Sequence, residues 1–163
     1  MERVKIVNGN ILNATEDIIC QQVNCQGTMG SGLARQLRAR YPKMFVQYKS
    51  WCNFASTPEA LLGTVHFYYH TLEDSDYPVK IVANIFGQLT YGREPNVIYT
   101  DYDALGSGLV KVSQVARATK KTTAIPYGLG CGLAKGDWNR VLPMIESRET
   151  FINKFVTIYR LEK

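Results

Sequence analysis

The sequence has few of the features that mark exported or membrane-bound proteins. No apolar run in its 163 residues approaches the roughly 18 residues that a membrane-spanning helix needs. Residues 1–5 include three charged side chains and lack the apolar segment of a signal peptide. We therefore expect a cytoplasmic protein with no membrane partner.

Histidine is scarce and the cysteines are not paired, which argues against a zinc site. His66 and His70 lie in a β-branched and aromatic segment that predicts a strand, where residues four apart are separated by roughly 13 Å. The four cysteines form no C-x-x-C pair. Cys20 and Cys25 have an odd spacing in an apolar run, so they should point to opposite faces of a strand. We expect no metal and no cofactor.

The composition is that of an ordinary globular domain. Hydrophobic residues make up 45% and charged residues 20%, which excludes disordered and fibrous classes, and the length suits a single domain over residues 1–163. The net charge of +5 suits an anionic partner such as a nucleotide. The densest basic group has the spacing of a solvated helix face, so charge alone gives nucleic acid little support. That group is Arg35, Arg38, Arg40 and Lys43.

Strand and helix patterns alternate along the chain. Apolar runs predict strands over residues 4–7, 17–24, 63–69, 79–86, 122–126 and 154–161. Helical patterns cover residues 31–40, 42–54 and about 101–119, and a further helix follows Asp137, with Pro143 awkwardly placed inside it. This alternation predicts an α/β fold with one mixed, largely parallel central sheet and helices on both faces.

Two glycine-rich loops, over residues 26–34 and 127–136, each join a predicted strand to a predicted helix. Such a loop offers free backbone N–H groups and the positive end of a helix to an anion. Ordinary tight turns are the alternative for either loop alone, but two at the carboxyl ends of strands can hold a diphosphate from both sides. A bulky residue at Gly130 is then expected to block the cleft. No G-x-x-x-x-G-K-[ST] motif is present, which excludes a P-loop NTPase.

Four motifs, in this order and spacing, resemble those of a macro domain. They are Val7-Asn8-Gly9-Asn10-Ile11, Gln22-Val23-Asn24-Cys25, Met29-Gly30-Ser31-Gly32-Leu33-Ala34 and Ile125-Pro126-x-Gly128-x-Gly130-Cys131-Gly132-Leu133. The resemblance covers nearly the whole chain. It is closest to the branch of the terminal ADP-ribose protein glycohydrolase and the fungal ADP-ribose 1″-phosphate phosphatase. It implies a three-layer α/β/α fold with a cleft for ADP-ribose or an ADP-ribosylated substrate.

Carried over by position, the resemblance implies a set of ligand-binding residues. Asn10, Ile11 and Leu161 would meet the adenine, and Asn24 would reach the distal ribose. The first loop would face phosphate and distal ribose through Met29, Gly30, Ser31, Gly32 and Leu33. The second loop would wrap the diphosphate through Gly128, Leu129, Gly130, Cys131, Gly132 and Leu133. Whether the chain acts alone or beside an ADP-ribosyltransferase stays open.

The chain departs from the family pattern at three positions. Macro domains usually carry Asp where this chain has Asn10, so a bond to adenine loses its charge assistance. The branch places a lysine where this chain has Phe86-Gly87-Gln88, and an aspartate where it has Ala134. The amine nucleophile and its carboxylate partner are therefore both missing.

Two residues are candidates for chemistry in their place. Asp137 would be either the N-cap of the last helix or a general base that orients water, and Asn24 would position a ribose hydroxyl or that water. Cys131 has no histidine in a matching position to activate it. The sequence leaves two functions open. One is a hydrolase acting on a distal-ribose derivative, either the 1″-phosphate or an ADP-ribosyl ester, and the other is an ADP-ribose reader without turnover.

Overall fold

A computed structural model describes residues 4–147, 150–151 and 155–162. These residues form a sheet of six strands in the order β1-β6-β5-β2-β4-β3. The strands are β1 (Lys5–Asn8), β2 (Ile18–Asn24), β3 (Val65–Thr71), β4 (Pro78–Gln88), β5 (Thr123–Pro126) and β6 (Val156–Arg160). Only the pair β3 and β4 is antiparallel among them. The sheet is therefore mixed and largely parallel.

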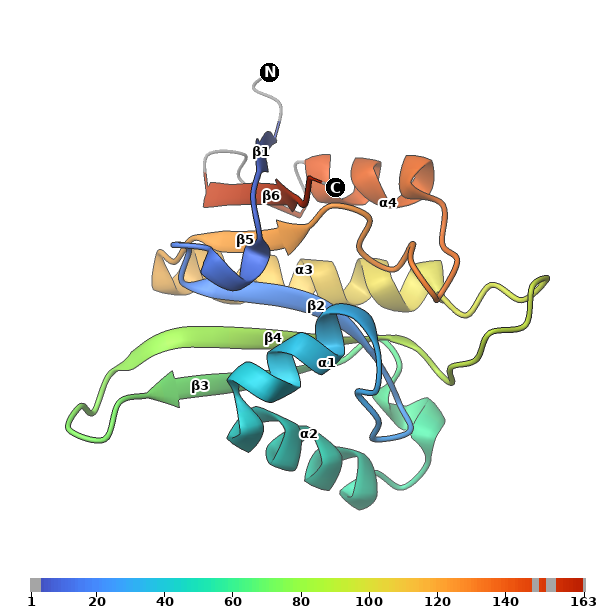
Figure 1. The fold of residues 1–163 in the computed structure, drawn as a ribbon, viewed down its shortest axis with the longest axis horizontal. Helices are drawn as coiled ribbons and strands as arrows, with labels where there is room; N and C mark the ends of the chain where they lie inside the picture. The colour runs from blue at the N-terminus through green and yellow to red at the C-terminus, as the bar shows by residue number, and fades with distance from the viewer. Residues whose placement is uncertain (1–3, 148–149, 152–154, 163) are drawn as a thin grey trace.

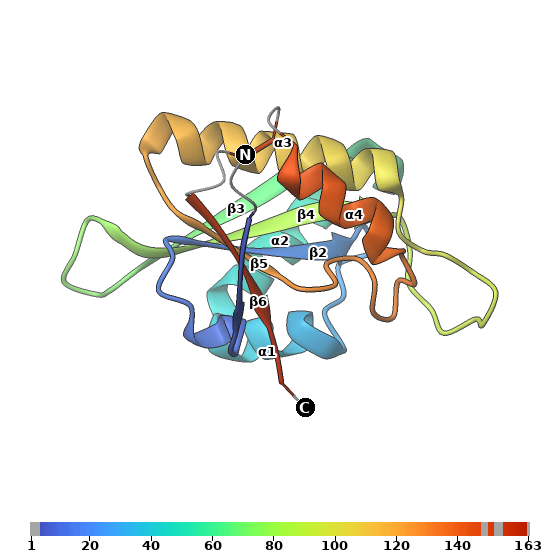
Figure 2. The same ribbon diagram turned by 90° about the horizontal axis from the view of Figure 1, so that it is seen from above.

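Helices cover both faces of this sheet (Figures 1 and 2). Helices α1 (Gly32–Arg40) and α2 (Pro42–Phe54) lie on one face, and α3 (Tyr102–Thr119) and α4 (Trp138–Glu146) lie on the other. Two short 3-10 helices, η1 (Ile11–Asn13) and η2 (Pro58–Leu61), join the elements. The predicted three-layer α/β/α fold with a mixed sheet is confirmed.

Side-chain alternation along β2 divides the core into two halves. Ile18 packs with Leu105 of α3 in one buried cluster, whereas Ile19 packs with Tyr48 of α2 in the other. Cys20 belongs to the first cluster, and Cys25 belongs to the second. The odd spacing of the two cysteines therefore placed them correctly, and all four cysteines are free thiols.

Local signals in the sequence set most helix boundaries. Pro42 occupies the first turn of α2, where its missing N–H costs nothing. Asp101 caps α3, because its carboxylate accepts a hydrogen bond of 3.0 Å from the backbone N–H of Ala104. Pro143 lies inside α4 on its exposed side, where water can satisfy the carbonyl that its ring leaves unpaired. The closing strand begins at Val156, and residue 154 of its predicted range lies outside the described residues.

The sheet order brings the two glycine loops together. β2 and β5 are parallel neighbours, with Ile18 beside Thr123 and Ile19 beside Ala124. Their carboxyl ends therefore meet at one edge of the sheet, and the two loops leave from these ends. Because of this pairing, the two glycine loops lie next to each other and can line one site.

Two glycines of α3 provide a matched test of how the helix packs on the sheet. A Cβ at Gly108 would lie 2.3 Å from Cγ2 of Ile85, whereas a Cβ at Gly106 would meet nothing closer than 3.7 Å. We expect Gly108→Ala to destabilise the domain by about 1–3 kcal/mol. Gly106→Ala should stabilise it by up to about 1 kcal/mol, because alanine favours helix. Urea unfolding of both variants measures the difference, and equal midpoints would contradict this packing.

Candidate functional site

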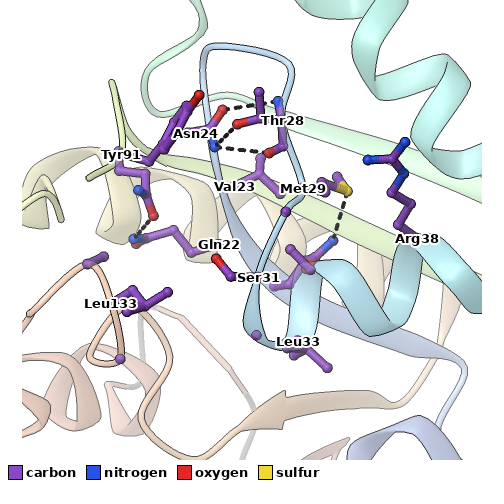
Figure 3. A pocket seen from close by; sticks show the side chains of 18 of the residues that line it. Gln22, Val23, Asn24, Thr28, Met29, Ser31, Leu33, Arg38, Tyr91 and Leu133 are labelled. Carbon is purple, nitrogen blue, oxygen red and sulfur yellow. Dashed lines mark hydrogen bonds between the residues drawn. The ribbon is translucent and has the colours of Figure 1, made fainter. Parts of the chain in front are cut away.

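A cavity of about 760 Å³ lies where β2, β4 and β5 end. The first glycine loop lines one wall and the second glycine loop lines the opposite wall. Figure 3 shows Leu133 of the second loop across from Ser31 of the first, with Gln22 of β2 between them. The predicted cleft shared by both loops is confirmed.

Asn24 holds the first glycine loop from within. Its Nδ2 donates to the carbonyl and the hydroxyl of Thr28, both at 3.0 Å, and its Oδ1 accepts from the backbone N–H of Gln26 at 2.9 Å. The Tyr48 hydroxyl of α2 donates to the Asn24 carbonyl at 2.7 Å. Burial raises the pKa of Tyr48, so this hydroxyl remains a donor. Asn24 is therefore a positioning residue of the loop, and its contact with a ribose stays a prediction.

The second glycine loop is tied to three other elements through one amide. Gln22 Nε2 donates to Gln88 Oε1 and to Thr100 Oγ1, both at 2.9 Å, and the Thr100 hydroxyl donates to the Gly130 carbonyl at 2.6 Å. These bonds connect the loop to β2, to the end of β4 and to the residue before the α3 cap. Gly130 has a φ of +73°, which an L-residue with a side chain rarely adopts.

The expectation that a bulky residue at Gly130 would block the cleft is wrong. A Cβ there would lie 2.9 Å from Oε1 of Gln22 and 3.3 Å from Cδ2 of Leu105, so it points into the protein. Gly30 and Gly132 differ from it. They line the cavity, have no left-handed φ, and a Cβ on either would meet nothing within 4 Å. A side chain at either position would therefore project into open space at the cavity wall without a clash.

The residues predicted to meet adenine lie together in an adjoining groove of about 610 Å³. Asn10, Ile11 and Leu161 line it. Four residues line both the groove and the main cavity, so the two spaces are continuous. These four are Gly32, Leu33, Pro126 and Tyr127. Asn10 Oδ1 accepts from the backbone N–H of Leu12 at 3.0 Å and caps η1, so the amide that replaces the family's aspartate also has a local structural role.

Two predicted site residues lie elsewhere. Asp137 is exposed, does not line the cavity and caps α4 by accepting from the backbone N–H of Asn139 at 2.9 Å. The capping role is confirmed, and this position does not favour the alternative of a general base. Cys131 does not line the cavity either, because its thiol turns back to the Leu129 carbonyl at 3.3 Å. Burial, with a smaller contribution from the charge of Asp137, raises the pKa of this thiol to about 11.

The charge of the cavity was not predicted. Arg38 of α1, Lys49 of α2 and Arg93 of the loop over residues 89–99 all line it. The lining within the described part of the chain contains no Asp, Glu, His or Cys. Arg38 belongs to the group assigned to a solvated face; it is exposed, yet its guanidinium lies 3.8 Å from the centroid of the Phe45 ring, which also lines the cavity. None of the three cations falls in a motif, so no local pattern marks them as cavity residues.

The described residues contain neither a metal-binding cluster nor a helix suited to a membrane. Among the residues that the structure describes, no group of three or more His, Cys, Asp or Glu side chains is placed to hold a metal ion. Within the same residues, no helix has the length and apolar character needed to cross a membrane.

Comparison with solved structures defines the class of fold. The macrodomain of DarG from Mycobacterium tuberculosis superposes with a TM-score of 0.73 at 24% identity, over 95% of each chain. A protein of unknown function from Bacteroides thetaiotaomicron superposes with a TM-score of 0.78 at 24% identity, over 98% of each chain. DarTG from Thermosipho africanus, solved in complex with ADP-ribose, gives a TM-score of 0.73 at 20% identity, over 96% of this chain and 41% of that one. The chain has the macrodomain fold.

Sequence comparison identifies which proteins of known activity the chain resembles. The chain is 30% identical over 135 residues to the DNA ADP-ribosyl glycohydrolase of Mycobacterium tuberculosis, which covers 82% of this chain but only 35% of that protein. It is 23% identical over 176 residues to the ADP-ribose 1″-phosphate phosphatase of Scheffersomyces stipitis, covering 94% of this chain and 99% of that protein. No protein-family profile matches the chain. The resemblance to the branch that contains the fungal phosphatases is confirmed.

The Tyr48 hydroxyl provides a test of how the first loop is held. We expect Tyr48→Phe to destabilise the protein by about 1–2 kcal/mol, because the buried Asn24 carbonyl loses its donor at 2.7 Å. Tyr68→Phe is the control, since its hydroxyl contacts His70 and lies outside the cavity lining. Urea unfolding gives the stability, and proteolysis within residues 25–31 reports the loop. Unchanged proteolysis in Tyr48→Phe would contradict the assigned role.

Proposed function

We propose that this macrodomain fold binds ADP-ribose in the cavity between its two glycine loops. The adenine would occupy the groove at Asn10, Ile11 and Leu161, and the diphosphate would lie between the loops. The observation that carries this proposal is the lining itself, which combines residues of both glycine loops with three cations and, in the described residues, no acid. The complex of DarTG from Thermosipho africanus with ADP-ribose supports the ligand class.

We propose as its activity the hydrolysis of an ADP-ribose derivative at the distal ribose, either the 1″-phosphate or an ADP-ribosyl ester. The names of the curated relatives support this class, since they act on ADP-ribosyl DNA or on ADP-ribose 1″-phosphate. In this cavity the cations would stabilise a departing anion, and neutral side chains such as Gln88 would orient water. If the substrate is the ADP-ribosyl ester, it implies an ADP-ribosyltransferase as partner. The cytoplasmic location remains a prediction from the sequence.

A reader that binds without turnover is the second candidate. One observation favours it: neither a carboxylate nor an imidazole lines the described cavity, and Gln88 and Ala134 occupy the positions where the resembling branch has its lysine and aspartate. Such a site has no ordinary proton acceptor. A product assay on ADP-ribose 1″-phosphate, ADP-ribosylated protein and ADP-ribosylated DNA separates the two candidates.

Filling the cavity tests the binding site. Titration calorimetry should show tighter binding of ADP-ribose than of AMP, because only the longer ligand reaches both loops. Gly132→Val should reduce ADP-ribose affinity at least about tenfold, since its side chain would enter the open space where the diphosphate lies. Gly106→Ala, a glycine substitution outside the cavity, is the control. Equal affinities for AMP and ADP-ribose, or an unaffected Gly132→Val, would count against the site.

The role of Asp137 is tested by a substitution that keeps the cap. Asn caps a helix nearly as well as Asp but cannot take a proton. Because Asp137 is exposed and outside the cavity lining, we expect Asp137→Asn to retain both stability and turnover. A fall of about 100-fold to 10,000-fold in rate with unchanged stability would instead assign it as the general base.

A further inference from the structure

The excess positive charge of the protein is concentrated in one helical layer. The chain has 19 basic and 14 acidic residues, which gives its net charge of +5. Helices α1 and α2, over residues 32–54, carry five of the basic residues and no acidic residue, so the rest of the chain has 14 of each sign and is neutral. Both helices cover the same face of the sheet (Figure 2). A charge gathered on one face attracts an anionic partner to that face.

A groove of about 710 Å³ lies between α1 and α2, beside the first glycine loop. It is lined by two arginines and six apolar or glycine residues: Met29, Gly30, Arg35, Arg38, Ala39, Pro42, Phe45 and Val46. The described lining contains no acidic side chain. Figure 3 shows Arg38 beyond Met29, on the side away from Leu133. This arginine therefore lies on the outer side of the first loop, away from the second glycine loop.

The two arginines of the groove are placed to bind carboxylates. Arg35 and Arg38 are three residues apart in α1, so their side chains leave the same side of the helix. The Arg38 guanidinium lies 3.8 Å from the centroid of the Phe45 ring, a contact that holds the cation against the groove wall. A guanidinium presents its donors as a planar fork that matches a carboxylate. Two such forks, one helical turn apart, suit a chain segment with more than one carboxylate.

The apolar part of the lining indicates which class of anionic partner fits. The Val46 side chain is 63% exposed, and Pro42 beside it adds further apolar surface. A partner that offers charge alone would leave this surface in water. The Phe45 ring already packs against Arg38 and, with 6.2 Å between ring centroids, against Tyr48, so it offers no free platform on which a nucleic-acid base could stack. The groove therefore fits a protein segment better than a nucleic acid.

We propose that the groove between α1 and α2 docks an acidic protein segment that also carries apolar side chains. Its carboxylates pair with Arg35 and Arg38, and its apolar side chains cover Pro42 and Val46. Residues 29 and 30 line both this groove and the main cavity, so a docked segment contacts the first glycine loop from outside. The inference goes beyond the proposed function and does not depend on it, because neither the charge nor the apolar lining of the groove requires ADP-ribose.

The test measures the binding of three fluorescent probes by anisotropy at low salt. The first is a peptide of about 14 residues in which glutamate and leucine are interspersed. The second replaces each leucine with serine, and the third is a single-stranded DNA oligonucleotide of the same net charge. We expect the peptide with leucine to bind at least about tenfold more tightly than either of the others, because only it supplies both carboxylates and apolar surface.

Matched variants locate the binding surface. Arg35→Gln and Arg38→Gln should each weaken the peptide with leucine about three- to fivefold. Arg140→Gln is their control, since Arg140 is also an exposed helical arginine stacked on an aromatic ring, but it lies in α4 on the other face of the sheet. Val46→Ser should weaken the same peptide about threefold. Val97→Ser, an exposed valine outside the groove lining, is its control. Circular dichroism checks that every variant is folded.

Each outcome decides for or against the docking groove. Preferred binding of the peptide with leucine, weakened by the groove variants and not by their controls, supports it. Equal binding of the serine peptide or of the oligonucleotide would overturn it, because the surface would then recognise charge alone. Unchanged affinity in both arginine variants would place the peptide elsewhere, and loss of the peptide at saturating ADP-ribose would place it in the main cavity; either result overturns the groove. Titration of ADP-ribose into the same protein tests the proposed function separately, so one can fail while the other stands.

Discussion

The site depends on the hydrogen bonds of one side-chain amide, that of Gln22. Its Nε2 reaches Gln88 Oε1 and Thr100 Oγ1, and the Thr100 hydroxyl continues the chain to the Gly130 carbonyl. A glycine loop in free solution would sample many conformations, and ordering it costs roughly 1–2 kcal/mol per residue. Here partly buried hydrogen bonds from neighbouring segments compensate part of that cost. The second wall of the cavity is therefore held by side chains of the protein itself, and no ligand is needed to order it.

The layered fold could be predicted because its signals are local and repeated. Apolar runs such as Ile18-Ile19 mark central strands, and Asp101 and Asp137 mark helix starts by a capping chemistry that acts within three residues. The two glycine loops were expected to lie together because each follows a parallel strand, and the carboxyl ends of parallel strands share one edge of the sheet. Asn10 and Leu161 line one groove, as the family resemblance implied, although the two residues lie far apart in the sequence.

The rest of the site could not be predicted because it depends on where individual side chains point in the folded protein. Whether a Cβ at Gly130 points into the cavity or into the protein is decided by a φ of +73°, which no spacing pattern records. Lys49 reaches the cavity only because α2 packs beside the first loop, and Arg38 lines it although its sequence pattern describes an exposed helix face. Asp137 and Cys131 are adjacent to the cavity in sequence, yet each side chain is used elsewhere.

The anchoring of the loop over residues 89–99 also bears on how a ligand would enter and leave. Lys135 bonds to the Glu94 carbonyl, and the backbone N–H of Tyr99 donates to the Ala134 carbonyl at 2.8 Å. The loop that presents Tyr91 and the second glycine loop are thus fastened to each other and would have to move as one body. The first glycine loop is tied to the same segment, because Gln26 Nε2 donates to the Leu89 carbonyl at 3.0 Å. The segment over residues 89–99 therefore bonds to both walls of the cavity, so a change in the position of either wall during ligand exchange would be felt by the other.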